Sequence, residues 1–545
     1  MHTKLFIFKI VRIISLFINI FIFNYNNTQT IEMKTFLNYI TDIEELQQNL
    51  ICIKEDKTNK TKYFFNTILF FTNERDSSKN KTLKKLEEAV EDTNINIIPL
   101  VAEEVHYVVK DDKILINDDK TSIVINEQSN VDTICIVRLG AQDSEECCEC
   151  IKEIQDWGIF TLNPIQSAKK ASNKYTTAVL LNRYDIPQPK YTLVCKNDIE
   201  KGLESLSKKL KDIHKEAADY ESDEAQKCEY VVKILNGHGG TGVFLVNGKT
   251  ILATLQAMFA INEDIELLVQ AKEEADGGDI RVHVLTMRTE QKILAAMKRK
   301  KLGKDFRSNV SLGATAEPIE LTEKQKEIAL KVAKISGMPW CAVDIMPLVK
   351  GSNDDFKEYD YNVVLEYNAS PGTDGISEVI GENFMKILLT NINNINELVL
   401  APKTIGYVEN ITLTMEDATE IVMECKLDTG NGAKASTIGC DKVTEYDDHV
   451  NASIDGHVYM FEKVGVSKAI VGQVTEERIT VKIPCIQIGT RKLLNAEFAL
   501  VDNRDKKQKV LINREIMSKL AYNISPMKKH LLVDEFADLK VVDKK

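Results

Sequence analysis

The chain has 545 residues, with 70 Lys and Arg against 82 Asp and Glu, which gives a formal net charge of −12. Hydrophobic residues make up 43% and charged residues 28%, a composition that excludes a largely disordered chain, and the length indicates several domains. Nucleic-acid binding needs clustered Lys and Arg, so the acidic balance argues against a nucleic-acid partner. The 11 cysteines are too sparse for a disulfide scaffold and favour reduced thiols in a cytoplasmic protein.

The N-terminus contains an apolar segment. Residues 5–23 are long enough to cross a bilayer, but Lys9 and Arg12 interrupt them. A sequence of ordinary globular composition begins at Met33. We therefore expect Met33 to be the working start and residues 1–32 to be a hydrophobic extension, with a real membrane anchor as the alternative.

The next part of the chain, residues 33–163, alternates short β-rich runs with helical stretches, which predicts a small α/β domain. It includes Cys147, Cys148 and Cys150, which we assign to an ordinary helix rather than a metal site, because no second Cys or His pair has a zinc-like spacing.

The strongest chemical signals lie in a second predicted domain, residues 164–396. Its charged stretch 198–227 predicts a solvated helical insertion. A further helix is predicted after a capping box of Thr322 and Gln325, and Gly337 ends it.

A glycine-rich loop lies between two apolar runs within residues 229–246. Such a loop lets backbone N–H groups approach phosphate oxygens without obstruction by side chains. Lys233 lies in the first apolar run, where a charge is costly unless it meets an anion. A plain hairpin with a snorkelling lysine is the alternative.

Oxygen-bearing side chains mark two later apolar runs. Glu366 and Asn368 are two residues apart on one predicted strand and point to the same face, while Asp344 leaves another strand, which we expect to be its neighbour. Two carboxylates and an amide suit Mg²⁺ or Mn²⁺ that holds nucleotide phosphates. The alternative is that these carboxylates pair with nearby Lys or Arg.

Taken in order, these stretches resemble the ATP-grasp ligases of the RimK type, which add glutamate to protein or small-molecule carboxylates. The matching stretches are residues 137–140, 163–165, 172–177, 186–189, Lys233 with its glycine loop, 278–281, 306–309, 343–345 and 365–372. The resemblance implies a pre-ATP-grasp α/β domain followed by an ATP-grasp fold, with ATP and Mg²⁺ (or Mn²⁺) as cofactors.

The resemblance also implies roles for individual residues. Asp344, Glu366 and Asn368 would carry the metal, and Arg299, Arg307 and Asn309 would act at the transferred phosphoryl group. The implied ATP-binding residues are Lys174, Lys233, Gly237, Gly239, Gly240, Thr241, Gly242, Gln270, Ala271, Lys272, Glu273, Asp279, Arg281, Arg307, Ser308 and Asn309. Two departures are a hinge at Gln270 that is one residue short and Lys298 in place of a common acidic residue.

A linker at residues 397–404 precedes a β-rich region, residues 405–545. There Asp428-Thr429-Gly430 follows an apolar strand, as in the loop that presents the catalytic carboxylate of aspartic proteases; a plain β-turn is the alternative. With residues 477–478, 498–504 and 510–514, the region resembles the retropepsin-like domain of the so-called ATP-dependent zinc protease family, an all-β barrel. The resemblance implies that Asp428 is catalytic and that two chains meet as a homo-oligomer, because two carboxylates must share a proton.

This region departs from the family pattern at Asn431, Gly432, Gly439 and Asn513, so peptide binding competes with hydrolysis. For the whole chain we predict an ATP-dependent carboxylate–amine ligase, with a glutamate-like amino acid as one substrate and a protein or peptide carboxylate as acceptor. The alternatives are a small-peptide synthetase, a carboxylate kinase or a degenerate ATP-binding scaffold.

Overall fold

The computed structural model describes most of the chain beyond residue 62. The described residues are 63–110, 113–126, 129–139, 144–219, 221–237, 240–300, 314–394, 398–400, 402–471, 474–502 and 508–531. The apolar N-terminal segment and Met33 lie outside these ranges, so both predictions about them stay predictions. Among the helices of the described residues, none is long and apolar enough to cross a membrane.

The first sheet is parallel and has helices on both faces. Its strands, in spatial order, are β2 (Asn96–Val101), β1 (Thr67–Thr72), β6 (Thr133–Arg138) and β7 (Phe160–Leu162). Ile68 and Phe70 pack with helix α3 (Lys81–Val90), and Leu69 and Phe71 pack with α5 (Glu145–Asp156). This confirms the predicted α/β alternation.

The cysteine cluster lies on α5, where Cys147, Cys148 and Cys150 are buried in the core between this helix and the sheet. The prediction of an ordinary helix is confirmed. Short elements complete this region: α4 (Ser129–Asp132) and the antiparallel sheet β3 (His106–Lys110), β4 (Lys113–Asn117) and β5 (Ser122–Ile125).

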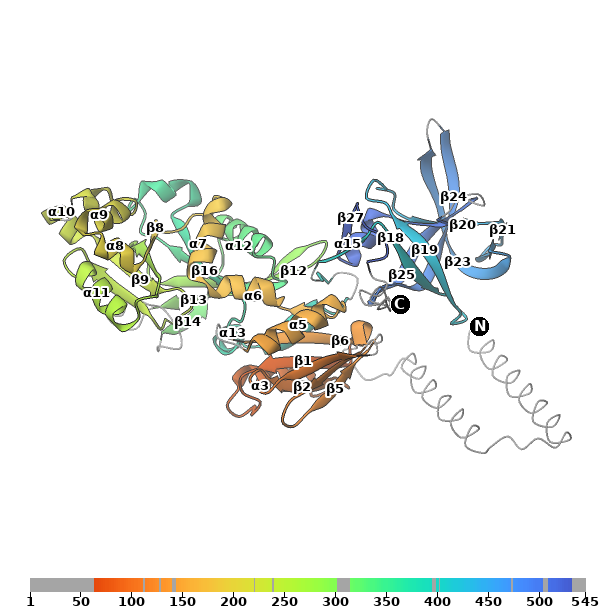
Figure 1. Ribbon diagram of the computed structural model, residues 1–545, viewed down its shortest axis with the longest axis horizontal. Coiled ribbons are helices and arrows are strands. Elements are labelled where there is room, and N and C mark those ends of the chain that lie inside the picture. The colour runs from red at the N-terminus through yellow and green to blue at the C-terminus, as the bar shows by residue number, and fades with distance from the viewer. Residues whose placement is uncertain are drawn as a thin grey trace, which may run out of the picture. The chain divides into compact units, whose positions relative to one another are not determined.

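A second sheet carries the glycine-rich loop. Its strands, in spatial order, are β10 (Val243–Asn247), β9 (Glu229–Ile234), β11 (Leu267–Ala271) and β8 (Tyr191–Val194), all antiparallel. Figure 1 shows helices gathered around β8 and β9, namely α8 (Lys196–Glu200), α9 (Leu203–Lys211), α10 (Asp223–Lys227) and α11 (Ile251–Ile261).

The predicted insertion at 198–227 is helical and most of its charged side chains are exposed, as expected, but one face of it also contributes to a core. Leu206, Leu210 and Ile213 are buried in one core with Val232 of β9. These side chains recur four and three residues apart, which places them on one face of α9 and its extension towards the sheet.

The third sheet is antiparallel and holds the acidic residues. Its strands, in spatial order, are β14 (Thr315–Pro318), β13 (Gln291–Lys300), β12 (Asp279–Thr286), β15 (Trp340–Pro347) and β16 (Asn362–Asn368). Helices α6 (Ile165–Ser172), α7 (Lys174–Arg183), α12 (Glu323–Ser336), α13 (Asp374–Ile380), α14 (Phe384–Asn391) and the 3₁₀ turn η3 (Asp354–Tyr359) accompany it. The capping box of Thr322 and Gln325 before α12 and the left-handed Gly337 after it are confirmed.

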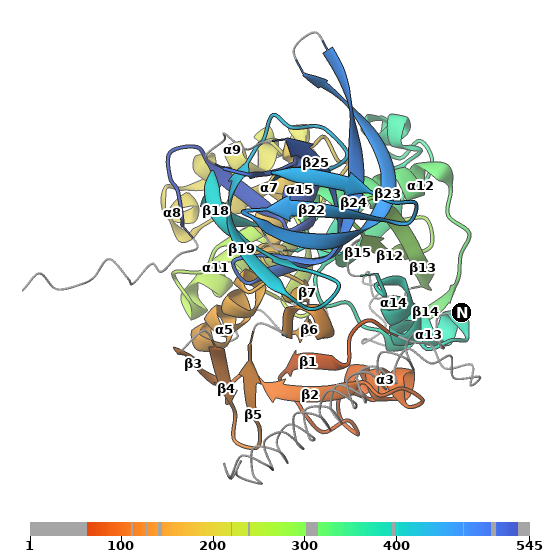
Figure 2. The ribbon, with the colours of Figure 1, turned by 90° about the vertical axis from the view of Figure 1, so that its right-hand side faces the viewer.

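The C-terminal region is built almost entirely of strands, as predicted. Pairing of β18 (Val408–Thr414) with β24 (Val474–Ile488) closes a ring that also contains β19 (Glu420–Leu427), β26 (Val510–Ile512), β20 (Ser436–Cys440) and β25 (Arg491–Asp502). Figure 2 shows β23 (His457–Val471) and β24 as a long hairpin that reaches past the other strands. The remaining elements are β17 (Lys403–Gly406), β21 (Lys442–Glu445), β22 (His449–Ile454), α15 (Arg514–Lys519) and β27 (Tyr522–Ser525).

Candidate active site

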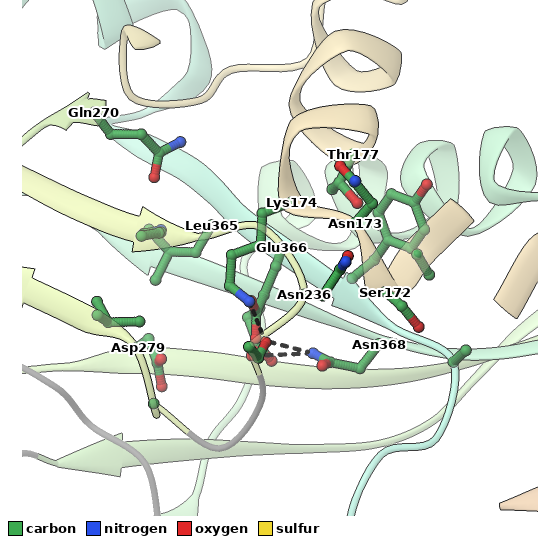
Figure 3. A pocket seen from close by; sticks show the side chains of 18 of the residues that line it. Ser172, Asn173, Lys174, Thr177, Asn236, Gln270, Asp279, Leu365, Glu366 and Asn368 are labelled. Atoms are coloured by element: carbon green, nitrogen blue, oxygen red, sulfur yellow. Dashed lines mark hydrogen bonds between the residues drawn. The ribbon is translucent and has the colours of Figure 1, made fainter. Parts of the chain in front are cut away.

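A cavity of about 1010 Å³ lies where the second and third sheets face helices α6 and α7. Its lining includes side chains from β9, β11, β15 and β16. Residues as far apart in sequence as Lys174, Gln270 and Asn368 therefore line one cavity (Figure 3). The predicted residues that line it are Lys174, Lys233, Gly237, Gly240, Gln270, Ala271, Lys272, Glu273, Asp279, Arg299, Asp344, Glu366 and Asn368.

Two lysines enter the cavity from different elements. Lys174 is the first residue of α7, and its backbone N–H donates to Leu235 O (3.0 Å), which ties the helix to the end of β9. Its Nζ donates to the carbonyl of Gly237 in the glycine-rich loop. Lys233 reaches the same cavity from β9. Both ammonium groups therefore lie beside the loop that the sequence predicts to bind phosphate.

Burial disfavours both of these charges. It lowers the pKa of Lys233 to about 8, and the nearby Lys174 lowers it further, while the carboxylate of Glu366 opposes the shift. Burial also lowers the pKa of Lys174, again opposed by Glu366. Around these two lysines, which share the carboxylate of Glu366, the cavity therefore favours an added anion.

The glycine-rich loop is so tight that several of its positions accept only glycine without strain. A Cβ atom on Gly237 would lie 2.5 Å from the carbonyl oxygen of Thr241, and Gly240 and Gly242 have φ of 83° and 72°. Those φ values are left-handed and suit glycine. Gly239 lies outside the described residues, and Thr241 and Gly242 do not line the cavity.

The three predicted metal ligands lie on neighbouring strands. Asp344 of β15 is directly opposite Glu366 of β16, and Ala342 is opposite Asn368, which confirms that the two strands are neighbours. Asn368 Nδ2 lies 3.3 Å from Asp344 Oδ2 and 3.5 Å from Glu366 Oε1. All three side chains line one wall of the cavity.

This donor set fits a hard divalent cation. Carboxylate and amide oxygens are the ligands that Mg²⁺ takes from protein, with phosphate oxygens and water completing its shell. Glu366 faces the two lysines and keeps part of its surface exposed to the cavity. Asp344 also keeps acceptor capacity, because Oδ1 receives one N–H while Oδ2 receives three.

Asp344 belongs to a chain of alternating charges across three strands. Arg281 of β12 donates to both of its oxygens, from Nε (2.7 Å) and Nη2 (2.6 Å). Arg299 of β13 donates to both oxygens of Asp279 at 2.6 Å and contacts Asp344 at 2.9 Å. The sequence alternative of carboxylates paired with arginines is therefore realised at Asp344, alongside its place in the cavity wall.

The arginines set the protonation states of this chain of charges. Arg281 and Arg299 overcome burial and lower the pKa of Asp344 to about 2. Asp344 and Asp279 in turn raise the pKa of Arg299 above its ordinary value, despite burial. Asp344 and Arg299 are thus both charged at neutral pH, and each stabilises the charge of the other.

The part of the chain that forms this cavity is similar to known proteins. A family described as RimK-like ATP-grasp domain matches residues 171–392. The "Probable alpha-L-glutamate ligase" of Thioalkalivibrio sulfidiphilus (strain HL-EbGR7) is 30% identical over 247 residues, which are 45% of this chain and 71% of that relative. The chain belongs to this family of RimK-like ATP-grasp ligases.

Two further proteins are also similar to part of the chain. The "Probable alpha-L-glutamate ligase" of Vibrio atlanticus (strain LGP32) is 29% identical over 268 residues, which are 49% of this chain and 78% of that relative. The crystal structure of D-alanyl-alanine synthetase A from Vibrio cholerae O1 biovar eltor str. N16961 has 15% identity and a TM-score of 0.43, and covers 61% of this chain and 99% of that one.

The residues of the predicted hinge lie at the end of β11 and line the cavity. Gln270 and Ala271 are buried at the end of β11, and Lys272 forms an ion pair with Glu229 (2.9 Å). Burial raises the pKa of Glu273, whose carboxylate accepts from Asn353 Nδ2 at 3.3 Å. Apolar side chains of Val231, Met346 and Leu365 line the cavity near this hinge.

The structure adds residues that the sequence reasoning did not single out. Asn173 caps α7, where its side chain accepts from the backbone of Thr176 (2.9 Å), and so fixes the start of the helix that carries Lys174. Asn236 lines the cavity beside the loop. An Asn directly before a helical run is a readable N-cap signal, so Asn173 was within reach of the sequence.

The remaining predicted residues fall into two groups. Arg307, Ser308 and Asn309 lie outside the described residues, so their predicted roles remain predictions. Arg281 contacts the site through Asp344 rather than by lining the cavity, and Asp428 belongs to the C-terminal sheets.

Proposed function

We propose that this chain is an ATP- and Mg²⁺-dependent carboxylate–amine ligase that adds glutamate, or a similar amino acid, to a carboxylate of a protein or peptide. The observation that carries the proposal is the joint placement of Lys174, Lys233 and the glycine loop opposite Glu366 and Asn368 in one cavity. Cations for phosphate and oxygen ligands for its metal thus face each other. The printed name of the relatives, alpha-L-glutamate ligase, supports the choice of amino acid.

The proposed reaction has two steps with a balanced transfer of bonds. A carboxylate oxygen of the acceptor attacks the γ-phosphorus of ATP, the bond to the β–γ bridging oxygen breaks, and ADP leaves. The amine of the amino acid then attacks the acylphosphate carbon, loses a proton, and expels phosphate to leave an amide.

The protein's own part in this reaction is to hold charge. Lys174, Lys233 and the loop N–H groups would bind phosphate oxygens, and Glu366 and Asn368, with Asp344, would hold Mg²⁺, which neutralises phosphate charge when bound. Removal of one such preorganised charge costs about 10²–10³ in rate in other enzymes. The fixed charges of Arg281 and Arg299 keep Asp344 ionised and in place.

The test is the replacement Glu366→Gln, which keeps the shape of the side chain and removes a metal-binding charge. We expect ATP turnover, followed as ADP release with glutamate and an acceptor peptide, to fall about 10²–10³-fold. Glu378→Gln, an exposed glutamate on α13, makes the same change of charge and should keep full turnover.

The outcome also separates the alternatives. Turnover within twofold of the parent in Glu366→Gln would contradict the site assignment. Mass spectrometry of host-cell proteins with and without the chain would detect added glutamate masses. Product formed from free amino acids alone would instead support a small-peptide synthetase, ADP release without an amine would support a carboxylate kinase, and no turnover under any condition would leave an ATP-binding scaffold.

We also propose that the C-terminal sheets recognise or trim the modified peptide through a retropepsin-like loop. This second candidate rests on the surroundings of Asp428, which directly follows β19, where its backbone N–H donates to Ile512 O (3.0 Å) of the parallel strand β26. Its Oδ1 accepts from Gly430 N (3.1 Å), so the half-buried carboxylate is held in a tight turn.

Asn513 holds the segment that follows this turn, because its Nδ2 donates to the carbonyls of Ala433 (2.8 Å) and Lys434 (3.1 Å). Its Oδ1 also accepts from Ser436 Oγ (3.1 Å). A single Asp-Thr-Gly requires a second copy of the chain for catalysis. We therefore expect a homo-oligomer, and Asp428→Asn should remove cleavage of glutamate-extended peptides while leaving ADP release intact. If sedimentation shows a monomer, or if the Asp428→Asn variant cleaves as fast as the parent, Asp428 is not a catalytic carboxylate and the loop can at most bind peptide.

A further inference from the structure

A second cluster of ligand-type side chains lies outside the cavity, where the helical insertion returns to the sheet. His214, Glu216 and Cys228 each place one ligand atom within 4.8 Å of the others. None of the three lines the cavity. A nitrogen, an oxygen and a sulfur ligand therefore converge in a part of the molecule that the ligase reaction does not use.

The fold fixes the backbone on both sides of this cluster. His214 directly precedes the 3₁₀ turn η1 (Lys215–Ala218), and its carbonyl accepts from Ala217 N (3.0 Å). Cys228 lies between the end of α10 and the first residue of β9, and its carbonyl accepts from Gly248 N (2.9 Å). The two side chains thus approach from segments that are each anchored independently.

The histidine ring is held in the manner of a metal ligand. Its Nε2 lies 3.2 Å from the backbone carbonyl of Glu229, and its face meets Tyr230 edge-on. A carbonyl can only accept, so Nε2 carries the proton and Nδ1 keeps the lone pair that a metal needs. Histidine ligands typically donate their other N–H to a backbone carbonyl or carboxylate in this way.

We propose that His214, Glu216 and Cys228 bind one zinc ion, with water as the fourth ligand. Zinc takes sulfur, nitrogen and carboxylate oxygen at about 2.0–2.3 Å in a tetrahedron, so ligand atoms at such a site lie about 3.3–3.8 Å apart. The observed cluster, within 4.8 Å, closes to that spacing with small side-chain movements. A thiolate also selects zinc over the hard Mg²⁺ of the nucleotide site.

The thiol ligand sets the pH dependence of the proposed binding. On binding, the thiol would release its proton to solvent as the metal–sulfur bond forms, which makes zinc affinity rise with pH.

The position of the site gives it a structural consequence. The carbonyl of Glu229 that fixes His214 also accepts from the backbone N–H of Lys272 (3.2 Å) in the hinge. A bound zinc would tie the insertion to the first residues of β9, the strand that carries Lys233 further along. The site would therefore stiffen the edge of the hinge without touching the nucleotide.

The experiment uses the full chain, reduced, freed of metal with a chelator, and then dialysed against ZnCl₂ with excess MgCl₂ to occupy the nucleotide site. We expect one equivalent of zinc to remain bound, as measured by elemental mass spectrometry. Cys228→Ser and His214→Gln should weaken zinc binding more than about 100-fold, since even outer-shell partners are worth about 10–100-fold. Cys485→Ser, which removes another half-buried thiol, is the matched control and should bind like the parent.

Cobalt(II) gives a second readout that is specific for sulfur. The parent and Cys485→Ser should show a thiolate-to-cobalt charge-transfer band in the near ultraviolet, and Cys228→Ser should lack it. Circular dichroism checks folding; should Cys228→Ser not fold, His214→Gln with its thiol intact decides the affinity test. Absence of the band from the parent, or zinc binding of parental strength in the folded variants, would overturn the proposal.

Discussion

Lys233 should strengthen nucleotide binding but lower the free energy of unfolding of the protein without nucleotide. The ammonium group is carried into the cavity on β9, and its pKa falls from 10.5 to about 8 because burial disfavours the charge. At about 1.4 kcal/mol per pKa unit, this difference corresponds to at most about 3.5 kcal/mol of folding free energy. The side chain keeps part of its surface exposed, so we expect a penalty of about 1–2 kcal/mol.

The perturbation is Lys233→Met, which keeps the apolar stem and removes the charge. We expect this variant to be more stable than the parent by about 1–2 kcal/mol at pH 7, and to have lost ATP turnover. In this variant the carboxylate of Glu366 still has the ammonium group of Lys174 nearby, so the negative charge of Glu366 remains compensated. The assay is urea unfolding of both proteins without nucleotide, alongside ADP release.

The pH dependence gives this prediction its sign. Below pH 8 the lysine is charged in both the folded and unfolded states, so the penalty is fully present. Between about 8 and 10.5 the folded protein loses the proton first, and the advantage of the variant should shrink towards zero. A variant less stable than the parent at pH 7, or one with the same advantage at pH 7 and pH 10.5, would refute the reasoning.

Two further predictions concern other parts of the site. Asp344→Asn should destabilise the fold by about 3 kcal/mol in urea unfolding at pH 7, because Arg281 loses its buried carboxylate while Arg299 keeps Asp279. The contribution of Asp344 itself should be present above pH 3.8 and disappear as the pH falls towards 2, and an unchanged unfolding midpoint would contradict it. Gly237→Ala should raise the KM for ATP at least about tenfold, about 1.4 kcal/mol, because its Cβ would lie 2.5 Å from Thr241 O. Gly465→Ala, whose Cβ meets nothing within 4 Å, should leave KM unchanged, and equal KM values for both variants would contradict a strained loop.

The sequence was most informative where local patterns, such as the alternation of side chains along a strand or the residues that cap a helix, determine the structure. Glu366 and Asn368 could be assigned to one face because strand side chains alternate, and the structure places both on the cavity wall. The capping box at Thr322 and the left-handed Gly337 likewise follow from local chemistry. These features depend on neighbours within a few residues, so no knowledge of the tertiary fold was needed.

Features that depend on strand pairing could not be read in the same way. The contact of Asp344 with Arg281 exists because β12 and β15 pair with these residues opposite one another, and register is not written in either segment alone. The cluster of His214 and Cys228 needs the insertion to fold back onto β9. The insertion is helical and largely exposed, as predicted, but its buried face was not predicted, although the spacing of four and three between Leu206, Leu210 and Ile213 is typical of such a face.

The lysines and the arginines of this site therefore have different roles. Removing the charge of Lys233 should raise the free energy of unfolding, whereas removing the carboxylate that pairs with the arginines should lower it. Arg281 and Arg299 are matched by Asp344 and Asp279, so their charges are balanced within the folded protein and hold β12, β13 and β15 in register. In the part of the chain that the structure describes, Lys174 and Lys233 share the nearby carboxylate of Glu366, and burial lowers the pKa of both lysines. An anion that enters the cavity would thus gain most from the lysines, whereas the arginines are already paired. Stabilisation by Lys233→Met together with destabilisation by Asp344→Asn would fit a site in which the lysines meet phosphate and the arginines position its acidic wall.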